Sequence, residues 1–256
     1  MIADIRQPVP SELPGSFSGL KVLIFGLGRF GGGVGAARFF AERGAEVTVT
    51  DRSPTSTLTD SLEQLSDVPI HAYQLGRHRE ADFTGADWIV VNPAIPPKNP
   101  YLETGRSSGA TVVTEMDLFL RWCPSAHVAG ITGTNGKSTT TDLTYRMLQA
   151  SGFRVHVGGN IGRSLLSEIS SIEAEDRVVV ELSSFQLHRL EPDTRRPRAV
   201  AMTHYAPNHL DWHTTEDEYR QAKEALLASS GLEGEVAVLP SSAAEYARWV
   251  AFSKPR

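Results

Sequence analysis

The residues best suited to chemistry lie together in the middle of the chain. Gly133-Thr134-Asn135-Gly136-Lys137-Ser138-Thr139 follows an apolar run, and a helix-forming segment continues from Thr141 to Ala150. In such a layout, backbone N–H groups and a helix N-terminus surround phosphate oxygens. A lysine in the place of Lys137 reaches the β- and γ-phosphates, and a hydroxyl in the place of Ser138 binds Mg²⁺. The pattern predicts a site for a nucleoside triphosphate.

One position departs from the general phosphate-loop pattern, which has a glycine five residues before Gly136. Ile131 occupies that position here. An ordinary strand–turn–helix connection that is rich in small residues is the alternative interpretation.

A triphosphate site also needs oxygen ligands for Mg²⁺. Glu181 follows the apolar run Val178–Val180, and a carboxylate in such surroundings is costly without a cation. We therefore expect Glu181 to bind the metal. The alternative is a surface glutamate at the end of a strand.

The sequence allows more than one role for three histidines and for one lysine near the end of the chain. His204, His209 and His213 are spaced closely enough for a zinc site, although the phosphate loop already implies Mg²⁺ and loop histidines are often plain surface residues. Lys223 follows in a helical pattern, where local sequence favours a solvated lysine.

A second glycine-rich turn lies near the start of the chain. Gly26–Gly31 has the spacing G-x-G-x-x-G between an expected strand (20–25) and an expected helix (32–43), and Asp51 comes 51 − 26 = 25 positions after the first glycine. This pattern places a phosphate-bearing ligand at a helix N-terminus. A dinucleotide, a nucleotide-sugar or no ligand at all would fit it. The extra glycines at 32, 33 and 35 should weaken the start of the helix.

Apolar strands alternate with helical segments along the whole chain, and polar residues follow each strand. The expected strands are 45–50, 88–91, 154–157, 177–180, 198–202 and 235–239. The expected helices are 215–230 and 243–252, and the segments 110–113 and 115–122 lead to the phosphate loop. Alternation of this kind predicts an α/β fold with a mostly parallel sheet. We expect a Rossmann-like domain in residues 1–114 and a phosphate-loop central domain in residues 115–256.

The composition is that of a globular protein. The 256 residues have a formal net charge of −5 and no basic run, which argues against a nucleic-acid partner. Cys123 is the one cysteine, which fits a reducing compartment and a small buried side chain. Neither a signal peptide nor an 18-residue apolar run is present, so we expect a soluble cytoplasmic protein with no membrane partner.

Taken together, these motifs resemble the Mur ligase family, and within it the branch that adds D-glutamate. The matching stretches are Gly26–Gly28, Gly133–Thr139, Gly158-Gly159-Asn160-Ile161-Gly162, Glu181–Leu187, His209–Asp211 and Tyr219–Lys223. The resemblance extends from about residue 20 to the end of the chain. The Thr-Asn-Gly-Lys-Ser loop is common to the whole family, including folylpolyglutamate synthetases.

The resemblance implies roles for residues around the phosphate loop. Residues Gly133–Thr139 would hold ATP, with Ser138 and Glu181 around one Mg²⁺. His209 and Lys223 would bind a second metal ion, and Lys223 would do so as a carbamate formed with CO₂. Lys137, His209 and Lys223 would be the catalytic residues.

The resemblance also implies a substrate, UDP-N-acetylmuramoyl-L-alanine, with D-glutamate as the second one. Arg29, Phe30, Asp51, Arg52 and the loop at 92–95, which includes Ala94, would meet the UDP group. Asn160 and Ser183 would contact the muramoyl part. The implied reaction forms an acyl phosphate, which the D-glutamate amine then attacks.

The chain departs from the family pattern at three positions and in length. The family has Gly where Ala94 stands, Asp where Asn208 stands and Asn where His204 stands, and the interval 223 − 209 = 14 is a residue shorter than in some members. The family also carries a third domain, so we expect a truncated chain, which would be monomeric.

Three other functions remain open at this point. One is a nicotinamide-dependent oxidoreductase, which would leave the second phosphate loop unexplained. Another is a different Mur or folylpolyglutamate-type ligase. The third is a substrate-binding fragment without catalytic activity.

Overall fold

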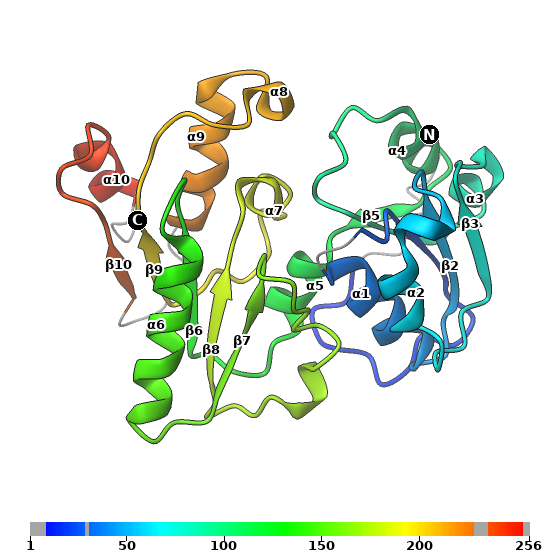
Figure 1. Cartoon of the computed structure of the whole chain (residues 1–256), viewed down its shortest axis with the longest axis horizontal. Coiled ribbons are helices and arrows are strands. Elements are labelled where there is room, and N and C mark those ends of the chain that lie inside the picture. Colours follow the sequence, from blue (N-terminus) through cyan, green and yellow to red (C-terminus); the bar gives the residue numbers. More distant parts are fainter. Residues whose placement is uncertain (1–8, 29–30, 228–234, 253–256) are drawn as a thin grey trace. The chain divides into compact units, whose positions relative to one another are not determined.

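The computed structural model describes residues 9–28, 31–227 and 235–252. These residues divide into two compact units (Figure 1). The first unit extends to Trp122 and also includes Gly162–Ser167, and the second contains Cys123–Ile161 and the chain from Glu168 onward. Two of the predicted substrate residues, Arg29 and Phe30, lie outside the described residues.

The first unit contains a five-stranded sheet in the order β3-β2-β1-β4-β5. Every strand pair in it is parallel, and β1 lies between β2 and β4, so the strand order reverses beside β1. Ligands of open α/β sheets bind at the carboxyl ends of the strands at such a reversal. The strands are β1 (Lys21–Phe25), β2 (Glu46–Asp51), β3 (Ala72–Leu75), β4 (Trp88–Val91) and β5 (Thr111–Val113). The helices are α1 (Gly32–Ala41), η1 (Thr55–Thr57), α2 (Thr59–Glu63), α3 (Glu80–Thr84), α4 (Pro100–Ser107) and α5 (Glu115–Trp122).

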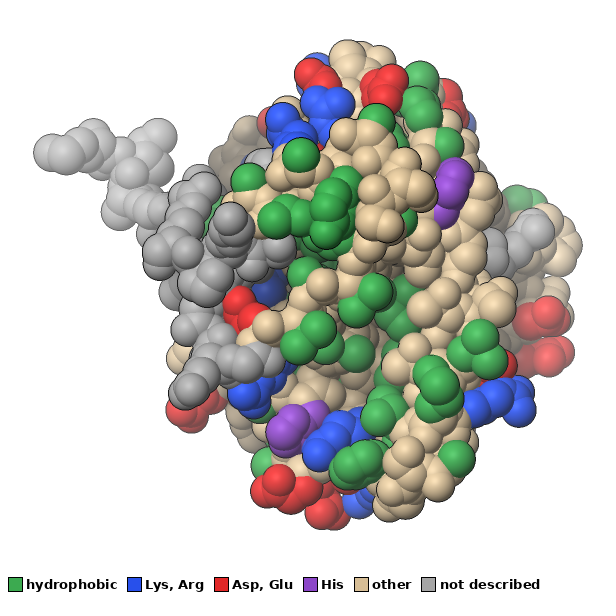
Figure 2. Space-filling model, turned by 90° about the vertical axis from the view of Figure 1, so that its left-hand side faces the viewer, with side chains coloured by type: hydrophobic (Ala, Val, Ile, Leu, Met, Phe, Trp, Pro, Cys, Tyr) green, Lys and Arg blue, Asp and Glu red, His purple; other side chains and the backbone are tan. Residues whose placement is uncertain are grey.

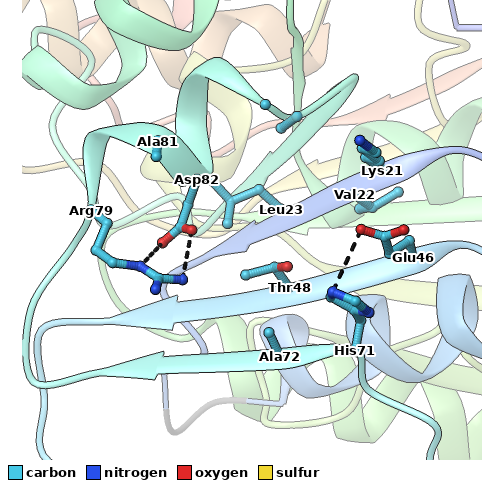
Figure 3. Close-up of a pocket in the computed structure, with 12 residues that line it drawn as sticks. Lys21, Val22, Leu23, Glu46, Thr48, His71, Ala72, Arg79, Ala81 and Asp82 are labelled. Carbon is cyan, nitrogen blue, oxygen red and sulfur yellow. Dashed lines mark hydrogen bonds and ion pairs between the residues drawn. The ribbon is translucent and has the colours of Figure 1, made fainter.

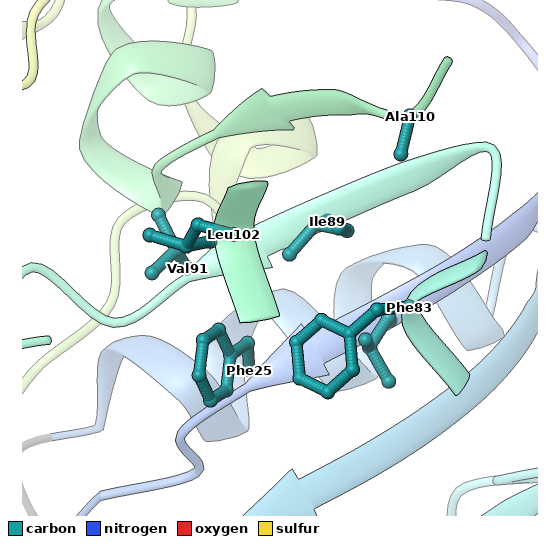
Figure 4. Packing of buried hydrophobic residues seen from close by; sticks show 7 residues of the cluster. Phe25, Phe83, Ile89, Val91, Leu102 and Ala110 are labelled. Atoms are coloured by element: carbon teal, nitrogen blue, oxygen red, sulfur yellow. The ribbon is translucent and has the colours of Figure 1, made fainter. Parts of the chain in front are cut away.

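Alternate residues of β1 and β4 point to opposite faces of this sheet, and both faces are covered. On one face, Phe25 packs with Phe83 of α3 and Leu102 of α4 in a buried hydrophobic cluster (Figure 4). The other members of that cluster are Leu23, Ile89, Val91 and Ala110.

Helix α5 belongs to the first unit because of its aromatic contacts. The ring of Trp122 stacks against Phe39 of α1 with ring centroids 5.9 Å apart, and it lies 6.3 Å from the ring of Trp88. The division between the units therefore falls after Trp122, eight residues beyond the expected boundary at Thr114 (122 − 114 = 8). The roles assigned to the two expected domains stay predictions.

The second unit contains a second five-stranded sheet, in the order β10-β9-β6-β8-β7, and its pairs are again parallel. The α/β fold with mostly parallel sheets is thus confirmed. The strands are β6 (Val128–Thr132), β7 (Val155–Gly159), β8 (Arg177–Glu181), β9 (Ala199–Met202) and β10 (Val236–Val238). The helices are α6 (Lys137–Ala150), η2 (Ile169–Ser171), α7 (Ser184–His188), α8 (Leu210–His213), α9 (Glu216–Glu224), η3 (Ala225–Leu227) and α10 (Tyr246–Phe252).

Two helix predictions in this unit are wrong at their ends. The helix expected over 215–230 is α-helical only to Glu224 and then tightens into the 3₁₀ turn η3, as helix termini often do. Residues 228–230 of that prediction lie outside the described residues. The helix expected from residue 243 begins at Tyr246.

Hydrophobic side chains are visible over part of the face of the second unit that Figure 2 presents. Among the described residues, Leu143 and Met147 of α6 and Val236 and Val238 of β10 are large hydrophobic residues that are more than half exposed. None of the described helices combines the length and the apolar character needed to cross a membrane.

Candidate functional site

The phosphate loop joins the central strand β6 to α6. Gly136 is the N-cap of α6 with φ 83°, and Gly133 has φ 151°. A side chain on Gly136 would be strained at that angle, so glycine allows the loop to turn directly into the helix. The loop therefore presents backbone N–H groups and the positive end of the helix dipole at the carboxyl edge of the sheet.

Segments from after β9 and from α9 hold this loop in place. The Thr203 hydroxyl donates to the carbonyl oxygen of Asn135 at 2.6 Å. Thr134 Oγ1 accepts from the backbone N–H of Ala206 at 3.0 Å and donates to its carbonyl oxygen at 2.8 Å. The Thr134 hydroxyl has a single proton, which it donates to the carbonyl oxygen of Ala206. Tyr219 is therefore the donor in the hydrogen bond of 2.9 Å between its hydroxyl and Thr134 Oγ1.

The side chains predicted to meet ATP lie along this loop and the first turn of α6. Lys137 Nζ donates to the carbonyl oxygen of Thr134 at 3.2 Å, so the ammonium group folds back over the loop. Asn135, Ser138 and Thr139 are exposed. The exposed Ser138 can offer its hydroxyl oxygen as a ligand to a phosphate-bound cation.

Glu181 ends β8 beside the loop strand β6 and is buried, with 1% of its surface exposed. Its Oε1 accepts a hydrogen bond from Asn160 Nδ2 at 3.1 Å, whereas its buried Oε2 has no partner among the described residues. The alternative interpretation of a surface glutamate is wrong. A buried carboxylate oxygen without a partner fits a hard cation such as Mg²⁺, which takes oxygen ligands.

Lys223 is also buried, so the interpretation as a solvated lysine is wrong. Its Nζ donates to the carbonyl oxygen of Gly133 at 2.9 Å and lies 4.7 Å from the centre of the Tyr219 ring. Burial, together with the nearby charge of Lys137, lowers the pKa of Lys223 to about 7. A large share of this amine is therefore neutral near pH 7, the form that reacts with CO₂.

The three histidines are in different surroundings. His209 is exposed, has φ 54° and lies 4.8 Å from the Phe185 ring centre. His213 is fully buried, its Nε2 lies 2.9 Å from Ser184 Oγ, and burial lowers its pKa to about 4. The backbone carbonyl of His204 accepts from the N–H of Thr134 at 2.7 Å. Within the described residues, no group of three His, Cys, Asp or Glu is placed to hold a metal ion.

The second glycine-rich turn lies where the strand order of the first unit reverses. Gly26, Gly28 and Gly31 all have positive φ, and Gly31 is the N-cap of α1. The Asp51 carboxylate accepts from the backbone N–H of Gly28 at 3.2 Å and from that of Ser53 at 2.8 Å. Asp51 therefore shapes this turn.

The remaining predicted substrate residues differ in their exposure and in their hydrogen bonds. Arg52 is exposed, and so is Ala94, whose backbone N–H donates to Asn92 Oδ1 at 3.0 Å. Asn160 is exposed but is held by Glu181. Ser183 is the N-cap of α7 in a capping box with Gln186, so its hydroxyl already has a structural role.

A cavity of about 250 Å³ lies elsewhere in the first unit (Figure 3). Its lining includes the first residues of β1, β2 and β3, so it lies toward the amino ends of the strands. Two pairs of its lining side chains contact each other, Arg79 with Asp82 at 2.9 Å and His71 with Glu46 at 3.6 Å. The glycine-rich turn is at the other end of the sheet.

Comparison with known proteins decides between the families that use such loops. The profile described as Mur ligase middle domain matches residues 131–256, and the profile described as Mur ligase MurD-like, N-terminal domain, matches residues 20–114. This chain belongs to the Mur ligase family.

Two curated relatives are each named UDP-N-acetylmuramoylalanine--D-glutamate ligase. The one from Geobacter metallireducens is 46% identical over 206 residues, which are 80% of this chain and 44% of the relative. The one from Roseiflexus sp. is 44% identical over 209 residues, 82% of this chain and 44% of the relative. This Mur ligase chain thus spans less than half the length of these relatives.

Solved structures show the same fold at lower identity. A UDP-N-acetylmuramate:L-alanyl-gamma-D-glutamyl-meso-diaminopimelate ligase from Neisseria meningitides has a TM-score of 0.63 and 18% identity, with 91% of this chain and 74% of that one covered. A murein peptide ligase from Psychrobacter arcticus has a TM-score of 0.53 and 16% identity, with 91% and 51% covered.

Sequence patterns did not reveal the residues that brace the phosphate loop of this Mur ligase chain. Thr203 was only the residue after a strand, and Tyr219 only one residue of a helix face. The spacing of Tyr219 four residues before Lys223 was the available signal, because such residues share one face of a helix.

Proposed function

We propose that this chain is the ATP-binding and UDP-substrate-binding part of a ligase that joins D-glutamate to UDP-N-acetylmuramoyl-L-alanine. The main support for the ATP assignment is the buried Oε2 of Glu181, which has no partner within the described part of the chain and lies on the strand next to the one that leads into the phosphate loop. The names of the two relatives support the choice of substrates. The product would serve peptidoglycan synthesis.

The first step would activate the substrate's L-alanyl carboxylate. A carboxylate oxygen attacks the γ-phosphorus of ATP, the bond to the bridging oxygen of ADP breaks, and an acyl phosphate forms. Lys137 and the N–H groups of the loop hold the phosphates and stabilise the charge that develops on them. Ser138 and Glu181 would hold Mg²⁺, which would neutralise phosphate charge.

The second step would form the amide bond. The D-glutamate amine attacks the acyl carbon, and inorganic phosphate leaves. Lys223, as a carbamate, and His209 would hold a second metal ion beside the phosphate loop. Because a carbamate turns the cationic lysine into an oxygen ligand, the lowered pKa of Lys223 supports this assignment.

The UDP group would bind in the first unit. The turn at Gly26–Gly31 and the N-terminus of α1 would take the diphosphate. Asp51, Arg52 and the loop with Ala94 would lie around the uridine, with Arg29 and Phe30 as further proposed contacts. Asn160 and Ser183 would contact the muramoyl part.

Phosphate release from Mg-ATP with UDP-N-acetylmuramoyl-L-alanine, with and without D-glutamate in bicarbonate buffer, tests this function. Release that depends on D-glutamate, and that Lys137→Met abolishes, would support a complete ligase. If the folded chain binds both ATP and the UDP-substrate without release, it is the substrate-binding part of such a ligase and has no ligase activity of its own. If it binds neither, the proposal is wrong.

A further inference from the structure

Helix α1 carries glycine at positions where a neighbouring segment lies too close for a side chain. A Cβ on Gly35 would lie 2.1 Å from both Cβ and Oγ of Ser164. A Cβ on Gly31, the N-cap of the helix, would lie 2.7 Å from the carbonyl oxygen of Gly162. The glycines that weaken the helix in isolation therefore admit the segment Gly162–Ser167, here called the strap.

A buried carboxylate fastens the strap. Oε1 of Glu115, at the start of α5, accepts from Ser164 Oγ at 2.7 Å and from the backbone N–H of Leu166 at 3.3 Å. Glu115 is 7% exposed, and burial raises its pKa. Leu165 and Leu166 are fully buried. The strap is thus anchored by both polar and apolar contacts.

The strap is separated in sequence from the rest of its unit. The residues on both sides of it, Ile161 and Glu168, belong to the second unit, whereas the strap packs within the first. It lies against Gly31, the last residue of the glycine-rich turn. The backbone of Gly162 therefore borders the N-terminus of α1, where an anion is stabilised.

We propose that the strap forms part of the binding site for the UDP diphosphate, and that Glu115 and Ser164 are positioning residues that keep the glycine-rich turn in its binding shape. This inference rests on the proposed function, which places the diphosphate at that turn. A displaced strap should weaken binding of the UDP-substrate and leave ATP binding unchanged, because the phosphate loop belongs to the other unit.

Two glycine-to-alanine substitutions in the first unit test this. Gly35→Ala forces the strap away, whereas Gly15→Ala in the same unit is the control, since nothing lies within 4 Å of the Cβ that it adds. We expect Gly35→Ala to weaken UDP-N-acetylmuramoyl-L-alanine binding about tenfold in calorimetry, from the loss of buried hydrogen bonds, and Gly15→Ala to leave it unchanged. Ser164→Gly removes both clashing atoms, so adding Gly35→Ala to it should cause no further loss.

Substitutions of Glu115 provide a second, independent test. Glu115→Gln keeps an acceptor oxygen for Ser164 and Leu166 and should preserve binding, whereas Glu115→Ala should weaken it about tenfold. ATP affinity, measured on the same samples, should stay constant in all variants.

Equal UDP-substrate affinity of Gly35→Ala and Gly15→Ala would overturn the inference, and so would parallel losses of ATP and UDP-substrate binding. A wild-type chain that fails to bind the UDP-substrate would instead overturn the proposed function.

Discussion

The ammonium group of Lys223 donates a hydrogen bond of 2.9 Å to the carbonyl oxygen of Gly133, the glycine that opens the phosphate loop. The contact spans 90 residues of sequence and is buried. It ties α9 to the loop, so the ionisation of this lysine is linked to the shape of the proposed ATP site.

This link predicts a pH dependence of stability. The folded-state pKa of Lys223 is lowered to about 7 from 10.5, so the unfolded chain binds the proton more tightly between these values. Stability attributable to this group therefore rises with pH through that window, by at most about 3 kcal/mol between pH 7 and 9.5. Urea unfolding at several pH values should show this rise in the wild type and a flatter profile in Lys223→Met. Parallel profiles for the two would contradict it.

Removal of the loop lysine should weaken nucleotide binding. Lys137→Met deletes the cation that would contact the β- and γ-phosphates, and we expect at least about a tenfold loss of ATP affinity. Calorimetric titration with ATP measures this, with Lys98→Met in the first unit as the control. An unchanged ATP affinity in Lys137→Met would show that Lys137 does not contact the nucleotide.

Thr203 should matter for the same ligand without touching it. Thr203→Val removes the hydrogen bond to the carbonyl oxygen of Asn135, which leaves that loop less well held. We expect ATP affinity to fall about fivefold and Thr203→Ser to restore most of it. If Thr203→Val and Thr203→Ser bind ATP with equal affinity, the hydrogen bond from residue 203 to Asn135 is not needed for ATP binding.

Glu181 should change its effect on stability when metal is added. Without Mg²⁺, Glu181→Gln should raise the melting temperature, because a neutral amide is cheaper to bury than a carboxylate with an unpartnered oxygen. With Mg-ATP, the wild type should gain more thermal stability than the variant. A Mg-ATP-induced shift of equal size in both proteins would exclude Glu181 as a metal ligand.

Ser183 has a structural role that must be separated from its proposed contact with substrate. Ser183→Ala breaks the capping box with Gln186 and should lower the free energy of unfolding by about 1 kcal/mol. Gln186→Ala is the matched control, since it disrupts the same box from the other residue. If Ser183→Ala weakens UDP-substrate binding and Gln186→Ala does not, the Ser183 hydroxyl contacts the substrate. Equal effects would leave Ser183 as a cap only.

Local patterns predicted the two glycine-rich turns and the parallel strands because strong apolar runs precede them. The same patterns missed β3 (Ala72–Leu75), which has no fully buried residue and so lacks a clear alternation. They also missed the strap, since the contact between Glu115 and Ser164 spans 49 residues and leaves no periodic trace. The burial of Lys223 could not be predicted from local sequence for a related reason. Its ammonium group contacts the phosphate loop, which is far from its own helix in the sequence.

The strap also has a consequence for how the chain is made. A ribosome releases residues in order, so α1 and α5 emerge well before Gly162–Ser167 does. Until then the Glu115 carboxylate has no Ser164 to accept from, and the space beside Gly35 is unfilled. The first unit therefore cannot complete its packing on the nascent chain until much of the second has been synthesised. A fragment that stops at Trp122 should accordingly be less stable than the same residues within the full chain.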